Sequence, residues 1–134
     1  MTKLIEIEGI GPVYAKKLQA AGISSVEGLL KEGATPKGRE GLAEKAGIDK
    51  GLILEWVNHA DLYRIKGVAE EYSDLLEEVG VDTVVELATR KPENLHAKIL
   101  EVNASKKLVR RPPSLAQVQK WVEEAKSLPR AVHY

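Results

Sequence analysis

The chain has 134 residues, of which 43% are hydrophobic and 30% are charged. This length and balance suit one compact domain, or two small packed units, with a buried core and a polar surface. Lysine plus arginine and aspartate plus glutamate each number 20, so the formal net charge is zero. The strongly basic class of nucleic-acid-binding proteins is excluded, and any electrostatic binding must come from local patches.

Further classes of function are excluded by what the sequence lacks. There is no cysteine, which removes disulfides, thiolate zinc sites and thiol chemistry. His59, His96 and His133 are interpreted as surface imidazoles, so neither a metal nor a cofactor is expected. No apolar run approaches the ~18–20 residues of a membrane span, and the first residues become acidic too soon for a signal peptide. We therefore expect no membrane association and a cytoplasmic location.

An internal repeat organises the chain. At a shift of 58 positions, Gly9 matches Gly67 and Tyr14 matches Tyr72. The register then slips by seven residues, so that Trp56 and Trp121 correspond. Because an internal repeat indicates a duplicated structural unit, we expect two units, over residues 1–64 and 65–134, with the extra residues inserted near 106–114.

Both units carry signals for helices and none for a convincing strand. Each helix is expected to begin at a capping residue or at a proline in its first turn, and several end at a glycine suited to the left-handed conformation. The start signals are Pro12, Ser24–Ser25, Thr35–Pro36 and Asp49 in the first unit, and Asp82–Thr83, Pro92 and Ser114 in the second.

Residues 7–18, Ile-Glu-Gly-Ile-Gly-Pro-Val-Tyr-Ala-Lys-Lys-Leu, have the pattern of a helix-hairpin-helix motif. The two glycines permit a tight turn, and the isoleucine between them fills the gap where two helices cross. Exposed amides at a helix N-terminus can also bind a phosphate, with two lysines about one turn further on. The hairpin therefore either only packs helices or, in addition, binds backbone phosphate without reading sequence. Its candidate binding residues are Gly9, Ile10, Gly11, Lys16 and Lys17.

The resemblance extends over nearly the whole chain. Each unit looks like the helical domains at the N-terminus of strand-exchange recombinases and is similar to the C-terminal domain of the RNA polymerase alpha subunit. The chain also resembles a family of small bacterial proteins of unknown function built from paired units of this kind. The resemblance implies an all-α fold of paired helix-hairpin-helix (SAM-like) units. Because Trp56 and Trp121 occupy matched positions in the repeat, we expect two pseudo-symmetric units that share one core, in which both tryptophans are buried. It implies no single function, because such domains serve DNA binding and protein docking alike.

The second hairpin departs from the pattern where it would meet phosphate. Ala69 and Glu70 stand where the first unit has glycine and proline, and Asp74–Leu75 replaces the lysine pair. Residues 65–88 hold seven acidic residues and one basic residue, a net charge of −6. We expect this degenerate hairpin to repel DNA. Its acidic 70–86 surface is either solvated or docks on a basic partner, which includes the protein's own basic segment.

That basic segment follows directly. Residues 89–111 hold seven basic residues and two acidic ones, a net charge of +5. The densest part is the basic loop, residues 106–111, which contains Lys106, Lys107, Arg110 and Arg111. No aromatic residue lies among these charges, so base stacking is not expected. The loop is either a solvated insertion or a second binding surface.

No arrangement of residues indicates catalysis, because paired carboxylates in an apolar setting, a Ser/His/Asp set and a phosphate-binding glycine loop are all missing. The expected function is a non-enzymatic, monomeric module that binds the DNA or RNA backbone through the first hairpin. The alternative is a protein-interaction or scaffold module that uses the acidic 70–86 surface and the basic 106–111 loop.

Overall fold

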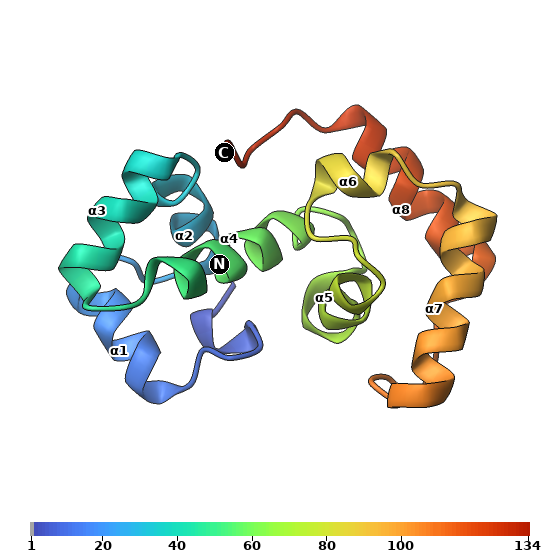
Figure 1. Ribbon diagram of the computed structural model, residues 1–134, viewed down its shortest axis with the longest axis horizontal. Coiled ribbons are helices and arrows are strands. Elements are labelled where there is room, and N and C mark those ends of the chain that lie inside the picture. The colour runs from blue at the N-terminus through green and yellow to red at the C-terminus, as the bar shows by residue number, and fades with distance from the viewer. Residues whose placement is uncertain (1) are drawn as a thin grey trace. The chain divides into compact units, whose positions relative to one another are not determined.

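The computed structural model describes residues 2–134, except for the side chains of Ala69 and Glu70, and this part of the chain is all-helical, without strands (Figure 1). Among the described helices, none combines the length and the apolar character that crossing a membrane requires. The elements are the 3-10 helix η1 (Leu4–Glu6) and the α-helices α1 (Pro12–Ala20), α2 (Val26–Glu32), α3 (Pro36–Ala46), α4 (Lys50–Leu62), α5 (Ala69–Glu78), α6 (Val84–Ala88), α7 (Pro92–Lys106) and α8 (Leu115–Ser127).

All the described α-helices except α5 begin at start signals that the sequence predicts. Ser25, Thr35, Thr83 and Ser114 each accept a hydrogen bond from the backbone N–H three residues later, at N···O distances of 3.0, 3.1, 3.2 and 3.2 Å. Each bond satisfies one of the N–H groups that a helix leaves unpaired in its first turn. At the other end of α3, Gly47 has φ +65°, the left-handed conformation expected after a helix.

The chain forms two compact units. Unit 1 consists of residues 1–61 together with 131–134, and unit 2 consists of residues 62–130. The boundary lies three residues before the one expected from the repeat, after residue 61 instead of 64. The last four residues, assigned to the second half by the sequence analysis, belong to unit 1.

In unit 1 the hairpin packs against a buried tryptophan. Ile7 and Ile10 are 1% and 3% exposed, and Trp56 in α4 is 1% exposed. The Tyr14 ring meets the Trp56 ring edge-on, with centroids 5.0 Å apart, a favourable geometry for aromatic pairs. Gly9 has φ +94°, and a Cβ atom at this position would lie 3.3 Å from Trp56 Nε1. The hairpin therefore needs glycine both for its backbone angle and for its closeness to the indole.

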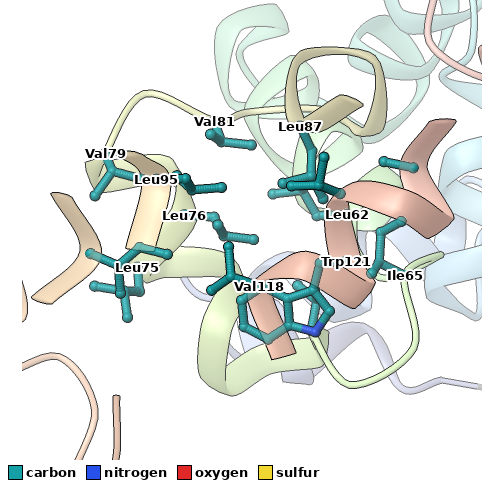
Figure 2. Packing of buried hydrophobic residues seen from close by; sticks show 14 of the residues in the cluster. Leu62, Ile65, Leu75, Leu76, Val79, Val81, Leu87, Leu95, Val118 and Trp121 are labelled. Carbon is teal, nitrogen blue, oxygen red and sulfur yellow. The ribbon is translucent and has the colours of Figure 1, made fainter. Parts of the chain in front are cut away.

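Unit 2 repeats these contacts around its own hydrophobic core. Gly67 has φ +86°, and a Cβ atom there would lie 3.5 Å from Trp121 Nε1. The Tyr72 and Trp121 ring centroids are 5.2 Å apart. Trp121 is one of the buried residues of this core, which gathers aliphatic side chains from α5, α6, α7 and α8 (Figure 2). Those labelled with it in Figure 2 are Leu62, Ile65, Leu75, Leu76, Val79, Val81, Leu87, Leu95 and Val118.

A methyl group at the first hairpin glycine should cost stability. We expect Gly9→Ala to lower the free energy of unfolding by about 1–3 kcal/mol, because alanine resists a positive φ and its Cβ would press on Trp56. Gly11→Ala is the matched control, since Gly11 has φ −89° and no atom lies within 4 Å of a Cβ built there. Urea denaturation measures both variants, and equal losses would contradict the interpretation.

The start of α2 should make stability depend on pH. Thr2 donates to the Glu27 carboxylate from its backbone N–H, at 2.9 Å, and from its hydroxyl, at 2.7 Å. Burial raises the pKa of Glu27, but these hydrogen bonds outweigh burial and hold the pKa below its ordinary value of 4.5. Folding lowers the pKa of Glu27, so the ionised carboxylate contributes to the stability of the folded protein. This contribution is present at a pH above the pKa of Glu27 in the unfolded chain, and it is lost as the pH falls through the pKa in the folded protein.

We therefore expect Glu27→Gln to lower the free energy of unfolding at neutral pH by less than about 1 kcal/mol, as for exposed charged groups. The difference between the wild type and this variant should shrink below about pH 4. Urea unfolding at neutral pH and below about pH 4 measures this difference in the free energy of unfolding. A difference that is the same at both pH values would rule out the proposed contribution of Glu27.

Candidate nucleic-acid interface

The first hairpin, Gly9–Ile10–Gly11, turns its backbone outward and its one side chain inward. Both glycines are exposed, whereas Ile10 is 3% exposed. The Ile10 N–H donates to the Ile7 carbonyl at 3.1 Å, which closes the turn. Of the predicted contact residues in the hairpin, Ile10 therefore fills the core, and only the glycines expose their surface.

The first turn of α1 follows directly and is open. Gly11 is its N-cap, Pro12 opens the helix, no side chain caps it, and its first turn contains no acidic residue. Proline has no N–H, and the next amides, those of Val13 and Tyr14, lie too early in the helix for an intrahelical acceptor. Nothing lies within 4 Å of a Cβ built on Gly11, so the space beside the N-cap residue is open.

Exposed lysines and the exposed apolar side chain of Val13 lie in the first turns of α1. Lys16 and Lys17 are both exposed, and Lys17 Nζ lies 5.9 Å from the centroid of the Tyr14 ring. Val13 is 68% exposed and was not identified as a candidate from the sequence. The available signal was its position, because Val13 follows the helix-opening proline and lies off the apolar stripe that Leu18 belongs to.

The basic loop in unit 2 has a fixed backbone. The side-chain amide of Asn103 in α7 holds Val109 from both sides, donating to its carbonyl at 3.1 Å and accepting from its N–H at 3.0 Å. The Tyr72 hydroxyl donates to the Arg111 carbonyl at 3.2 Å, and His96 Nε2 lies 3.0 Å from the Pro113 carbonyl. The loop is thus an ordered surface, and Asn103, which organises it, was not identified from the sequence.

The charges of this loop are not equally available. Lys106 forms an ion pair with Glu78 of α5, with Nζ and Oε2 2.5 Å apart. Lys107, Arg110 and Arg111 are exposed. The acidic surface and the basic loop therefore contact each other inside unit 2. The structure brings the predicted hairpin residues together in unit 1 and the predicted loop residues together in unit 2.

The second hairpin has acidic neighbours. The Lys66 N–H, just before Gly67, faces the Glu124 carboxylate of α8, at 3.2 and 3.4 Å from its two oxygens. Burial is the largest cause that raises the pKa of Tyr72, and the negative charge of Glu71 raises it further. The positive charge of Arg111 lowers the pKa by a smaller amount. The Glu70 side chain, part of the acidic 70–86 surface, lies outside the described residues. A carboxylate of the protein itself thus lies against this hairpin.

The histidines differ from one another in burial. His59 in α4 is 3% exposed, so its interpretation as a surface imidazole is wrong. Its position on the apolar side of α4, next to Ala60, explains the burial. His96 is half-buried and His133 is exposed. Within either single unit, the described residues hold no group of three imidazole or carboxylate ligands that could share a metal ion.

Removing the Asn103 amide should free the basic loop. We expect Asn103→Ala to lower the free energy of unfolding by about 1–3 kcal/mol, because the two backbone groups of Val109 lose their partner. Trypsin should then cleave after the basic residues of the loop faster than in the wild type. Asn94→Ala, at an exposed position of α7, is the control, and a rate of cleavage equal in all three proteins would contradict the role of Asn103.

Comparison with known proteins places these features in a family. A model of the domain of unknown function DUF4332 matches residues 8–128, from the first hairpin to the residue directly after α8. No curated protein and no solved structure matches the chain. The match covers both hairpins, the basic loop and every α-helix. The chain therefore belongs to the DUF4332 family of domains of unknown function.

Proposed function

We propose that the protein is a non-enzymatic binding module of two helix-hairpin-helix units that contacts the backbone of DNA or RNA through the first hairpin. The observation that carries this proposal is the first turn of α1, which no side chain caps and where Gly11 is exposed with open space beside it. The N-terminus of a helix carries a partial positive charge and unpaired N–H groups, and phosphate oxygens accept from such groups.

The charge around this turn agrees with an anionic ligand. Lys16 and Lys17 are exposed one turn into the helix, and no acidic residue lies in its first turn. Contacts of this kind neutralise phosphates and do not distinguish bases, so binding should be independent of sequence. With a net charge of zero, the affinity should be modest and fall steeply with salt.

The contrast with unit 2 supports assigning the contact to unit 1. Glu124 lies against the second hairpin, and Glu71 adds negative charge beside it. Either charge would repel a phosphate. In unit 2 the proposed contact is instead the basic loop, through Lys107, Arg110 and Arg111, with Lys106 contributing less because Glu78 already pairs with it.

The alternative is a protein-interaction or scaffold module that uses the acidic 70–86 surface and the basic loop. We place it second because the two surfaces already contact each other through Lys106 and Glu78, and Tyr72 also bonds the Arg111 carbonyl. These internal contacts use part of the surface that a protein partner would need. Absence of nucleic-acid binding at low salt would reverse the order.

Charge reversal at the hairpin tests the proposal. Fluorescence anisotropy of labelled duplex and single-stranded DNA should show micromolar binding at about 50 mM salt that collapses at about 200 mM. We expect Lys16→Glu with Lys17→Glu to abolish it. Lys31→Glu with Lys37→Glu makes the same charge change on exposed residues near the α2–α3 junction, away from the start of α1 (Figure 1), and should retain most of the binding.

A second variant separates the backbone contact from the charge. Gly11→Ala adds one methyl group where the phosphate is proposed to approach, and the structure leaves room for it without strain, so folding should be unchanged and binding weaker. If neither this variant nor the Lys16 and Lys17 reversal changes the affinity, the first hairpin is not the contact. Arg110→Glu with Arg111→Glu then tests the loop alone.

A further inference from the structure

The segment of residues 131–134 is held on unit 1 through its backbone. The His133 N–H donates to the Ala34 carbonyl at 2.7 Å, and Arg39 Nη2 donates to the His133 carbonyl at 2.8 Å. Ala34 lies between α2 and α3, and Arg39 lies in α3. Both polar backbone groups of one residue are thus bound by unit 1, whatever side chain that residue carries.

The side chains on either side of His133 make the specific contacts. Val132 is 2% exposed. The Tyr134 hydroxyl donates to Asn58 Oδ1 at 3.0 Å, and its ring centroid lies 5.8 Å from the Arg39 guanidinium carbon. His133 itself is exposed. Unit 1 therefore holds the side chains of Val132 and Tyr134 and leaves the side chain between them exposed, as when an extended peptide binds in a groove.

Arg39 is buried and held in place by hydrogen bonds on both sides of its guanidinium. Its side chain is only 5% exposed, and Nη1 donates to the Gly33 carbonyl at 2.8 Å, which fixes the guanidinium from the other side. Gly33 is required here, because a Cβ atom would come within 2.4 Å of Val57 Cγ2 in α4. A buried guanidinium needs hydrogen-bond acceptors, and the bound segment supplies one of them through the carbonyl of His133.

The segment does not fill the space available to it. A cavity of about 400 Å³ lies at the starts of α3 and α4 and is lined by Pro36, Arg39, Glu40, Lys50, Leu54 and Tyr134. Tyr134 is 65% exposed although its hydroxyl and ring are both engaged. The groove therefore has room beside Tyr134.

From these contacts we infer that unit 1 carries a peptide-binding site for an extended protein segment with the pattern aliphatic residue, any residue, tyrosine. The protein's own residues 132–134, Val-His-Tyr, are its resident ligand, and a segment of the same pattern from another protein binds when they leave. Arg39 and Ala34 hold the backbone, and Asn58 selects the tyrosine hydroxyl. None of these residues belongs to the first hairpin, so the site is independent of nucleic-acid binding.

The attached segment has an advantage over any free peptide. A tethered ligand acts at an effective concentration on the order of millimolar, so a free peptide competes poorly with it. The site must therefore be emptied before binding in trans is measured. Deleting residues 131–134 does this, and circular dichroism shows whether the shortened protein keeps its helices.

The probe is a fluorescein-labelled peptide of residues 127–134, titrated with the shortened protein and followed by anisotropy. We expect saturable binding to the shortened protein and at least about tenfold weaker binding to the full chain, where the site is occupied. Peptides carrying Val132→Asp or Tyr134→Ala should bind at least about tenfold more weakly, which corresponds to the loss of one buried or hydrogen-bonded side chain. A peptide with His133→Ala should bind like the parent.

Several results would overturn the inference. One is the absence of saturable binding up to about 1 mM peptide. Another is a Val132→Asp peptide that binds as tightly as the parent peptide, and a third is equal affinity of the full-length and shortened proteins for the parent peptide. If the deletion prevents folding, the same titration is made with the full chain carrying Val132→Asp, which empties the site without shortening the chain. DNA binding of either protein should equal that of the wild type, which separates this test from that of the hairpin.

Discussion

In both units the hairpin glycine lies against the indole nitrogen of a buried tryptophan, Gly9 against Trp56 and Gly67 against Trp121. Glycine is favoured at both positions because the backbone has a positive φ, and at Gly9 a Cβ atom would in addition lie tightly against the indole. The contact fixes the position of the turn relative to the helix that carries the tryptophan. The turn then determines where the next helix begins. The position of the open first turn of α1, on which the proposed function depends, follows from this contact.

The same scaffold therefore carries two hairpins with different electrostatics. Around the first, a glycine N-cap and two exposed lysines leave the helix start accessible to an anion. Against the second, Glu124 from α8 lies at the backbone. The difference arises from the side chains of the helix that follows each turn, together with Glu124 of α8. A protein with no net charge can in this way hold one surface suited to phosphate and another that is not.

Ordered loops and termini in this protein depend on single polar side chains that satisfy backbone groups. Asn103 holds Val109 in the basic loop, and Arg39 holds His133 on unit 1. Both side chains are almost fully buried, where an unpaired polar group costs more than a typical hydrogen bond contributes. Each side chain and the segment it holds are therefore ordered together, and loss of either partner should release the segment.

The sequence by itself determined the helical class, the repeated Gly–Tyr–Trp positions and most helix starts, because these depend on neighbours three or four residues apart or on a pattern repeated along the chain. Ser25, which caps α2 through a residue three positions away, is an example. Contacts between distant residues were decided only by the tertiary structure. Arg39 and His133 are 94 residues apart, and His59 is buried although the sequence favoured the surface. No local signal records which segments will meet, since burial and polar pairing over such separations follow from how the helices pack.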